Sequence, residues 1–93
     1  MVEGPLISVV VICYNQEQTI ARALDSILAQ QTVYSFEIVI GEDASPNDQT
    51  RSICEQYAAQ YPNIIRLLPA TKNKGLLKNY ADCLTQCKGK YIA

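Results

Sequence analysis

The sequence of 93 residues contains no histidine and no tryptophan. Without histidine, the chain cannot supply a Ser-His-Asp triad or a Cys-His pair for nucleophilic catalysis. Its charges almost balance, with 8 basic and 9 acidic residues, so it also lacks the excess of positive charge by which proteins bind nucleic acid or anionic membranes. We therefore expect no nucleic-acid partner.

Long apolar runs are missing as well. The longest one extends from Val9 to Tyr14, far short of the ~20 residues that a membrane-spanning helix needs. The first residues, from Met1 to Pro5, lack the basic segment of a signal peptide. These absences favour a cytoplasmic protein, with any association to a membrane left to regions outside this sequence. The length predicts one domain or a part of one.

The four cysteines, Cys13, Cys54, Cys83 and Cys87, form no Cys-x-x-Cys pair. The last two are four residues apart, on one face of a predicted helix, and could be soft metal ligands. Two thiols are only half of a zinc site, however. We expect all four cysteines to be reduced and mostly buried, acting as small apolar residues.

Strand-like and helix-like segments alternate along the whole chain. Short runs rich in β-branched residues predict strands at 7–13, 36–41 and 64–68, and the opening of a fourth at 90–93. Between them, apolar stripes at helical spacing predict three helices: Ile20, Ala23, Leu24, Ile27 and Leu28; Ile53, Cys54, Tyr57, Ala58 and Tyr61; Leu77, Tyr80, Ala81, Leu84 and Cys87. This alternation predicts an α/β fold with a doubly wound parallel sheet in β-α-β-α-β-α-β order, or the first half of one.

Capping signals precede the first two helices. Asn15, with Gln18 three residues later, predicts a capping box for the first helix. Ser45, followed by a proline and by Asp48, predicts the start of the second helix. Both helices are therefore expected to begin directly after these residues.

The loop at 70–75 is expected to be mobile and basic. Three lysines surround the start of the third helix, where backbone N–H groups favour anions. These residues could grip a diphosphate, or they could form a solvated basic loop; they are Lys72, Lys74 and Lys78. A dinucleotide-binding Gly-x-Gly-x-x-Gly motif is excluded, because the first strand–helix turn contains no glycine.

The residues best suited to bind a ligand follow the first two strands. Tyr14 ends the first strand, and Glu42 and Asp43 end the second. The carboxyl ends of neighbouring parallel strands lie about 5 Å apart, and open α/β sheets bind their ligands at this edge. A tyrosine ring can stack on a nucleobase while a carboxylate accepts hydrogen bonds from its ring N–H groups. The pair therefore predicts a site for a base.

Structural roles remain open for the same residues. Tyr14 could pack on the first helix, and Asp43 could complement the dipole of the second helix. Glu42 is more typical of a solvated or structural residue than of a catalytic one. The residues alone do not separate these alternatives from base binding.

Several of these segments, taken in order, resemble the family 2 glycosyltransferases of the GT-A fold. The match extends from Leu6 to Ala93, each motif is moderately specific, and the ordered set is strong. The matching segments are Ile7–Asn15, Ala23–Leu28, Phe36–Ser45 with Asp48, Asn73–Gly75, Lys78–Asn79 and Lys88–Ile92.

The resemblance implies that residues 1–93 are the N-terminal nucleotide-sugar-binding segment of a glycosyltransferase catalytic domain. The whole enzyme would transfer a sugar from a UDP- or GDP-sugar to a hydroxyl of a saccharide or lipid-linked acceptor, with inversion, in polysaccharide biosynthesis. By this resemblance Tyr14 stacks on the base, and Ile12 and Cys13 line its pocket. Asp43 bonds the base. Glu17 and Lys78 match positions of the family more weakly.

The sequence also departs from the family pattern. Proline is common where Ile12 stands, and Asp-Gly is common where Glu42 and Ala44 stand; the alanine bears on how the second loop bends. The family's acidic metal-binding motif and general base follow the segment that ends at Ile92. We therefore expect the ligands of a Mg²⁺ or Mn²⁺ ion to lie beyond Ala93, and this segment alone to be inactive.

The alternative is a non-catalytic, flavodoxin-like α/β signalling or interaction module. A phosphoacceptor domain of that shape needs acids at the end of the first strand, where this chain offers only Glu17. A redox module is disfavoured by the missing Cys-x-x-Cys pair. A sheet that ends at an open edge exposes apolar surface, so we also expect a homo-oligomer.

Overall fold

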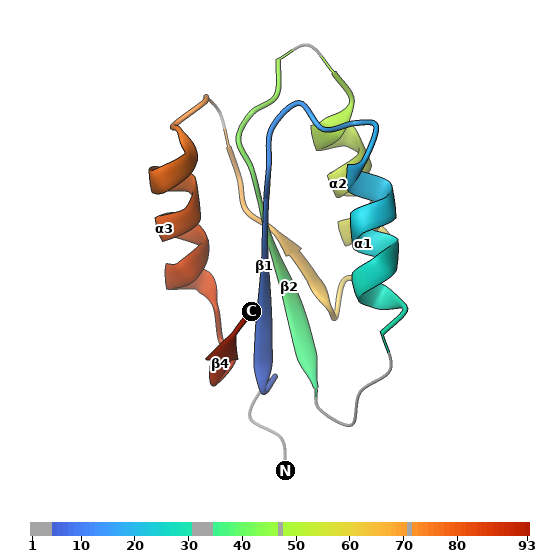
Figure 1. Cartoon of the computed structure of the whole chain (residues 1–93), viewed down its shortest axis with the longest axis vertical. Helices are drawn as coiled ribbons and strands as arrows, with labels where there is room; N and C mark the ends of the chain where they lie inside the picture. The colour runs from blue at the N-terminus through green and yellow to red at the C-terminus, as the bar shows by residue number, and fades with distance from the viewer. Residues whose placement is uncertain (1–4, 31–34, 47, 71) are drawn as a thin grey trace.

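The computed structural model describes residues 5–30, 35–46, 48–70 and 72–93. Residues 1–4, which bear on the signal-peptide prediction, and residues 47 and 71, in two predicted loops, lie outside this range. Four strands form one parallel sheet in the order β3-β2-β1-β4, which confirms the predicted fold class (Figure 1). The elements are β1 (Ile7–Cys13), α1 (Ile20–Leu28), β2 (Phe36–Glu42), α2 (Thr50–Gln60), β3 (Ile65–Leu67), α3 (Leu76–Gln86) and β4 (Tyr91–Ile92).

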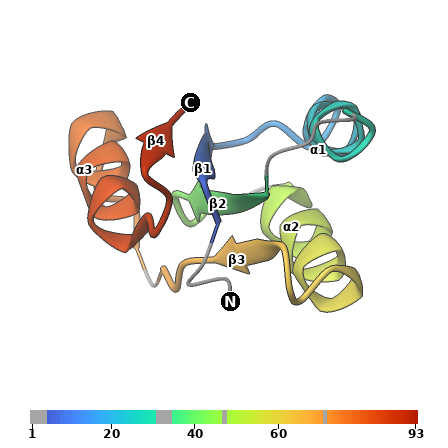
Figure 2. The ribbon, with the colours of Figure 1, turned by 90° about the horizontal axis from the view of Figure 1, so that it is seen from below.

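Helices cover both faces of the sheet. Helices α1 and α2 lie on one face and α3 on the other (Figure 2). Because strand side chains alternate between faces, β2 sends Ile38 and Ile40 into a core with α1 and α2, and Val39 into a second core with α3. The helices of the described residues are 9 to 11 residues long, and none has the length and apolar character of a membrane span.

The register of β1 and β2 sets the edge where the site lies. The two strands pair along their whole length, from Ile7 opposite Phe36 to Cys13 opposite Glu42. The N–H of Asp43 then donates to the Cys13 carbonyl at 3.0 Å. The residues that follow the two strands therefore emerge side by side, as the parallel arrangement predicts.

The first helix begins later than the capping pattern predicts. Asn15 has φ of 54°, in the left-handed region that asparagine tolerates better than most residues, and it turns the chain out of β1. The Gln16 carbonyl then accepts the N–H groups of Thr19 and Ile20 at 3.1 and 2.9 Å. The helix begins at Ile20, and Thr19 makes no side-chain capping bond. The predicted capping box of Asn15 and Gln18 is wrong.

Ser45 does not cap α2 either. The helix begins at Thr50, whose N–H donates to Asp48 Oδ1 at 3.0 Å. The Ser45 hydroxyl accepts the N–H of Asn15 at 2.8 Å and bonds the Glu42 carboxylate. Its polar group is therefore used to join two loops instead of starting a helix.

Helix α3 turns a different face to the sheet from the one predicted. Asn79 and Cys83 are buried, whereas Leu77 and Tyr80 of the predicted stripe are 84% and 42% exposed. The Asn79 amide donates to the Gly41 carbonyl at 2.8 Å, so the helix lies directly against the backbone of β2. A hydrogen-bonded asparagine in the interface is invisible to a search for apolar spacing, which explains the error.

The cysteines behave as small buried residues. Cys13, Cys54 and Cys83 are buried free thiols, and Cys87 is partly buried. The Sγ atoms of Cys13 and Cys54 lie 3.9 Å apart, and this contact together with burial raises the pKa of the Cys13 thiol. In the described part of the chain, no group of three or more Cys, Asp or Glu side chains is placed to hold a metal ion.

We predict that Gly41→Ala destabilises the protein. An added Cβ would lie 2.5 Å from the Cys83 sulfur and closer still to the Asn79 side-chain oxygen, so α3 must shift. Overpacking of this kind costs about 1–3 kcal/mol, which denaturant unfolding can measure. Cys83→Ala in the same protein removes one of the two clashes and should restore part of the loss. If the two substitutions changed the free energy of unfolding additively, Gly41 and Cys83 would not be in close contact.

Candidate functional site

A cavity of about 390 Å³ opens at the carboxyl edge of the sheet. Its wall comes from three segments that are far apart in the sequence: the end of β1, the end of β2, and the turn into α3. The lining residues are Ile12, Cys13, Tyr14 and Gln16; Asp43; and Asn73, Gly75, Leu76 and Asn79. The structure thus brings Tyr14 and Asp43 to one pocket.

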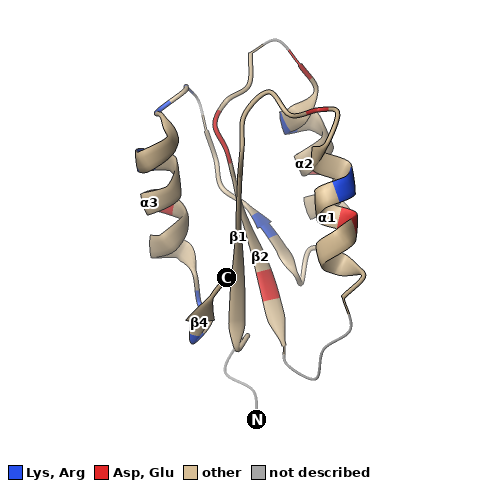
Figure 3. Cartoon of the chain, in the orientation of Figure 1, with Lys and Arg blue, Asp and Glu red and all other residues tan. Residues whose placement is uncertain are grey.

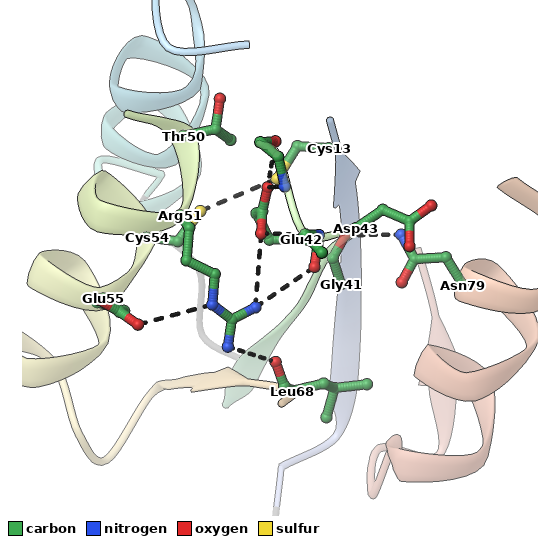
Figure 4. A network of polar contacts seen from close by, with 12 residues as sticks. Cys13, Gly41, Glu42, Asp43, Thr50, Arg51, Cys54, Glu55, Leu68 and Asn79 are labelled. Atoms are coloured by element: carbon green, nitrogen blue, oxygen red, sulfur yellow. Dashed lines mark hydrogen bonds and ion pairs between the residues drawn. The ribbon is translucent and has the colours of Figure 1, made fainter. Parts of the chain in front are cut away.

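The two consecutive acids at the end of β2 serve opposite faces of the sheet (Figure 4). Glu42 is 1% exposed and faces α2, where its carboxylate accepts the N–H groups of Ala44 and Ser45 at 3.1 and 2.9 Å. Arg51 Nη1 lies 3.6 Å from Glu42 Oε1, and its Nη2 donates to the Leu68 carbonyl at 3.0 Å. Glu42 therefore shapes the loop after β2 and takes the structural role left open above.

Asp43 faces the other side and holds the turn into α3. Its carboxylate, 4% exposed, accepts the Asn73 amide at 3.0 Å and the N–H groups of Lys74 and Gly75, both at 2.9 Å. The loop predicted to be mobile is therefore anchored at residues 73–75, and Asp43 faces the start of α3, not of α2. A carboxylate has about four lone-pair positions, so these three bonds leave one acceptor direction for a ligand.

Tyr14 is not sealed inside the core. Its side chain is 41% exposed and lines the pocket. The loop that carries it is bound to the neighbouring loop by backbone donors: Asn15 N–H to Ser45 Oγ at 2.8 Å, and Gln16 N–H to Thr50 Oγ1 at 2.7 Å. These bonds fix the backbone directly after Tyr14, whose side chain stays partly exposed at the pocket.

Two predicted site residues lie outside the pocket wall. Glu17 Oε1 accepts the Gln49 N–H at 2.7 Å, so its carboxylate braces the start of α2. The Lys78 ammonium lies 3.2 Å from Asp82, which also bonds Lys74 at 2.6 Å. These two ammonium groups, Lys74 first, hold the pKa of the Asp82 carboxyl below its usual value. Neither Glu17 nor Lys78 lines the pocket with the other predicted site residues.

Five pocket residues were not predicted: Gln16, Asn73, Gly75, Leu76 and Asn79. A signal was present for three of them, because the Asn73–Gly75 segment and Asn79 belong to the motifs of the family resemblance. The resemblance assigns the site position to Lys78, the basic residue before Asn79. The face that α3 turns to the sheet places the asparagine at the pocket instead.

The pocket suits a flat heterocycle. It combines an open aromatic ring, a buried carboxylate with one free acceptor direction, carboxamides from Gln16 and Asn79, and the apolar side chain of Ile12. In Figure 3, acidic residues gather in the loops after β1 and β2, and basic residues flank the start of α3. The arrangement can bind and orient a base.

One family model matches most of the chain, and several known proteins are similar to it. The sequence model described as "Glycosyl transferase family 2" matches residues 8–93. An uncharacterized protein of Mycobacterium tuberculosis is 42% identical over 86 residues, which are 92% of this chain and 25% of that protein. Chondroitin synthase of Escherichia coli is 34% identical over 88 residues, or 95% of this chain and 12% of the synthase.

A solved structure also resembles this chain. A mannosyltransferase of Pyrobaculum calidifontis, in complex with GDP-Man and Mn²⁺, superimposes with a TM-score of 0.80 at 27% identity. The likeness covers 96% of this chain and 26% of the mannosyltransferase. The chain thus spans about a quarter of the length of the M. tuberculosis protein and of the mannosyltransferase.

The loop after β2 contains a strained residue. Ala44 has φ of 56°, in the left-handed region, because its N–H turns back to Glu42 Oε1. A Cβ in this region costs roughly 1–2 kcal/mol. By the family resemblance glycine is common at this position, and a glycine would adopt this backbone conformation without that cost.

Ala44→Gly should therefore stabilise the protein. Strain relief exceeds the extra chain entropy of glycine, so we expect the free energy of unfolding to rise by about 0.5–1 kcal/mol. The same exchange at Ala23, inside α1, is the control and should lower it by about 1 kcal/mol. Chemical denaturation of the two variants measures both changes. An equal loss of unfolding free energy at the two positions would contradict the strain at Ala44.

Proposed function

The chain belongs to glycosyl transferase family 2, and we propose that in the complete protein it binds the nucleoside diphosphate of a sugar donor. The enzyme would transfer the sugar, with inversion, to a hydroxyl of a saccharide or lipid-linked acceptor. The observation that carries this proposal is the meeting of Tyr14 and Asp43 at one pocket. The alternative, a non-catalytic module, gives no reason for an exposed ring beside a buried carboxylate.

Base binding follows from the chemistry of the two side chains. The exposed Tyr14 ring would stack on the face of the base, a contact worth about 1–3 kcal/mol. The remaining acceptor direction of Asp43 would receive an N–H from the edge of the base, as uracil and guanine both present. Ile12 and Cys13 would close the wall behind it, as the family resemblance implies.

The diphosphate calls for a divalent cation, Mg²⁺ or Mn²⁺, which would offset the charge of the leaving group. Among the residues that the structure describes, no three metal-ligating side chains lie together, so these residues do not fit this ion. We expect its ligands, and the general base that deprotonates the acceptor, elsewhere in the complete protein. The role of this chain is to bind and orient the donor.

Replacing Tyr14 tests this function. Tyr14→Ala removes the stacking surface and should weaken UDP or GDP binding by roughly 5- to 150-fold, measured by calorimetry with Mn²⁺. Tyr14→Phe keeps the ring and should bind like the parent protein. Arg22→Ala, on the exposed side of α1 and outside the pocket wall, should also change little. An unchanged affinity in Tyr14→Ala, or no binding of either nucleotide by the parent protein, would overturn the proposal.

We also propose a cytoplasmic location and association of this chain with itself. Leu77 and Tyr80 on α3, and Tyr91 and Ile92 on β4, are large apolar side chains exposed by 42–84%. Exposed apolar surface of this kind drives association.

Light scattering of the 93-residue chain should therefore give a mass above 10.3 kDa. Leu77→Lys should shift it toward the monomer, because the charge interrupts the apolar face. Gln56→Lys, on the exposed side of α2, is the matched control and should leave the mass unchanged. A monomer at high concentration would refute self-association without bearing on nucleotide binding.

A further inference from the structure

A buried polar network lies at the amino end of the sheet, opposite to the pocket. Ser8 is fully buried and Glu37, its partner in the register, is 8% exposed. The Ser8 hydroxyl donates to Glu37 Oε2 at 2.5 Å, and Arg66 Nη2 donates to Glu37 Oε1 at 2.6 Å. These contacts link the three strands β1, β2 and β3 across one face.

The same network binds the connection between α3 and β4. The Lys88 N–H donates to Glu37 Oε2 and the Gly89 N–H to Ser8 Oγ, both at 2.7 Å. Arg66 Nη2 also donates to the carbonyl of Gln86, the last residue of α3, at 2.7 Å. Three backbone groups within residues 86–89 are thus bound by the side chains of three strand residues.

The fit at this connection is close. A Cβ at Gly89 would lie 2.5 Å from the Ser8 nitrogen, so the chain passes directly over β1. Burial raises the pKa of the Glu37 carboxyl, but the bonds from Ser8, Lys88 N–H and Arg66 outweigh it and lower the pKa below its usual value. The carboxylate therefore stays charged at neutral pH, and its contribution to stability is lost only as the pH falls through that lowered value.

Strand β4 has little else to hold it. It is two residues long, and its side chains, Tyr91 and Ile92, are 60% and 50% exposed. Its position rests on backbone bonds to β1: Tyr91 N–H to the Leu6 carbonyl at 3.0 Å, and Ala93 N–H to the Ser8 carbonyl at 2.8 Å. A pairing this short sets no register by packing, so the bonds at residues 88 and 89 must set it.

The register of β4 matters because the strand points at the pocket. It runs parallel to β1, with Ser8 opposite Ile92, and Val10 N–H donates to the Ala93 carbonyl at 3.0 Å. Any chain that continues from Ala93 in this register runs beside Val11 and Ile12 and reaches Cys13, in the pocket wall, after about four residues. A slip of one residue would turn every following side chain to the other face.

We propose that Glu37 is a positioning residue, which fixes the register of β4 through Ser8 and Lys88 and so places the following chain at the donor pocket. Glu37 touches no substrate, because it lies at the opposite end of the sheet. Its effect is transmitted by the backbone of β4 alone. The catalytic part of this inference rests on the proposed function, whereas the effect on β4 does not.

The test uses Glu37→Gln and Ser8→Ala in the complete protein. Loss of a hydrogen bond to a charged group should speed amide hydrogen exchange at Val10 and Ala93 by about tenfold or more. The kcat for sugar transfer should fall by a similar factor, while the affinity for UDP or GDP stays within about twofold, because Tyr14 and Asp43 are not disturbed. Ser8→Ala removes only a hydroxyl, so it keeps the test open if Glu37→Gln does not fold.

Tyr57→Phe is the matched control. It removes a bond of similar kind, from the Tyr57 hydroxyl to Asp25 at 2.6 Å, which joins α2 to α1 far from β4. It should lower the melting temperature without changing kcat or the exchange of Ala93.

Unchanged exchange at Val10 and Ala93 in both network variants would overturn the inference. So would an equal loss of kcat in Tyr57→Phe, since the effect would then be general destabilisation. If the parent protein bound neither UDP nor GDP, the proposed function would be wrong. The exchange rates of Val10 and Ala93 would still decide the role of Glu37, so failure of the proposed function and failure of this inference are distinguishable.

Discussion

The alternation of side chains at the end of β2 is the constraint on which the site depends. Glu42 and Asp43 are neighbours in the chain, so they must point to opposite faces of the sheet. Glu42 gathers its own loop and Arg51 on the α2 side. Asp43 gathers the turn at 73–75 on the α3 side. One pair of acids thus connects both helical layers to the same edge of the sheet. The pocket lies beside the second acid, Asp43.

The pocket is built mainly from backbone amides that donate to side chains. The N–H groups of Asn15 and Gln16 donate to Ser45 and Thr50, and those of Lys74 and Gly75 donate to Asp43. Loops fixed in this way need no apolar core of their own. Within the described residues, every buried side-chain nitrogen or oxygen has at least one hydrogen-bond partner, and Asp43 keeps one further acceptor direction.

The strands and the pairing of Tyr14 with Asp43 could be predicted from sequence, because β-branched runs define buried strands and parallel strands bring their ends together. The helix starts could not, because the groups that might cap them, Asn15 and Ser45, bond to each other's loops. The face of α3 was missed for a related reason. Its key contact joins the Asn79 amide to a backbone carbonyl, and contacts between distant segments leave no periodic trace.

Cys13 lines the pocket through its position on β1, yet its thiol belongs to the interior. The side chain is 4% exposed, and its sulfur lies 3.9 Å from that of Cys54. Since the reactive form of cysteine is the thiolate, the raised pKa of this group leaves almost none of it. An electrophile that enters the pocket would therefore meet Cys13 as a buried, protonated thiol, which reacts slowly.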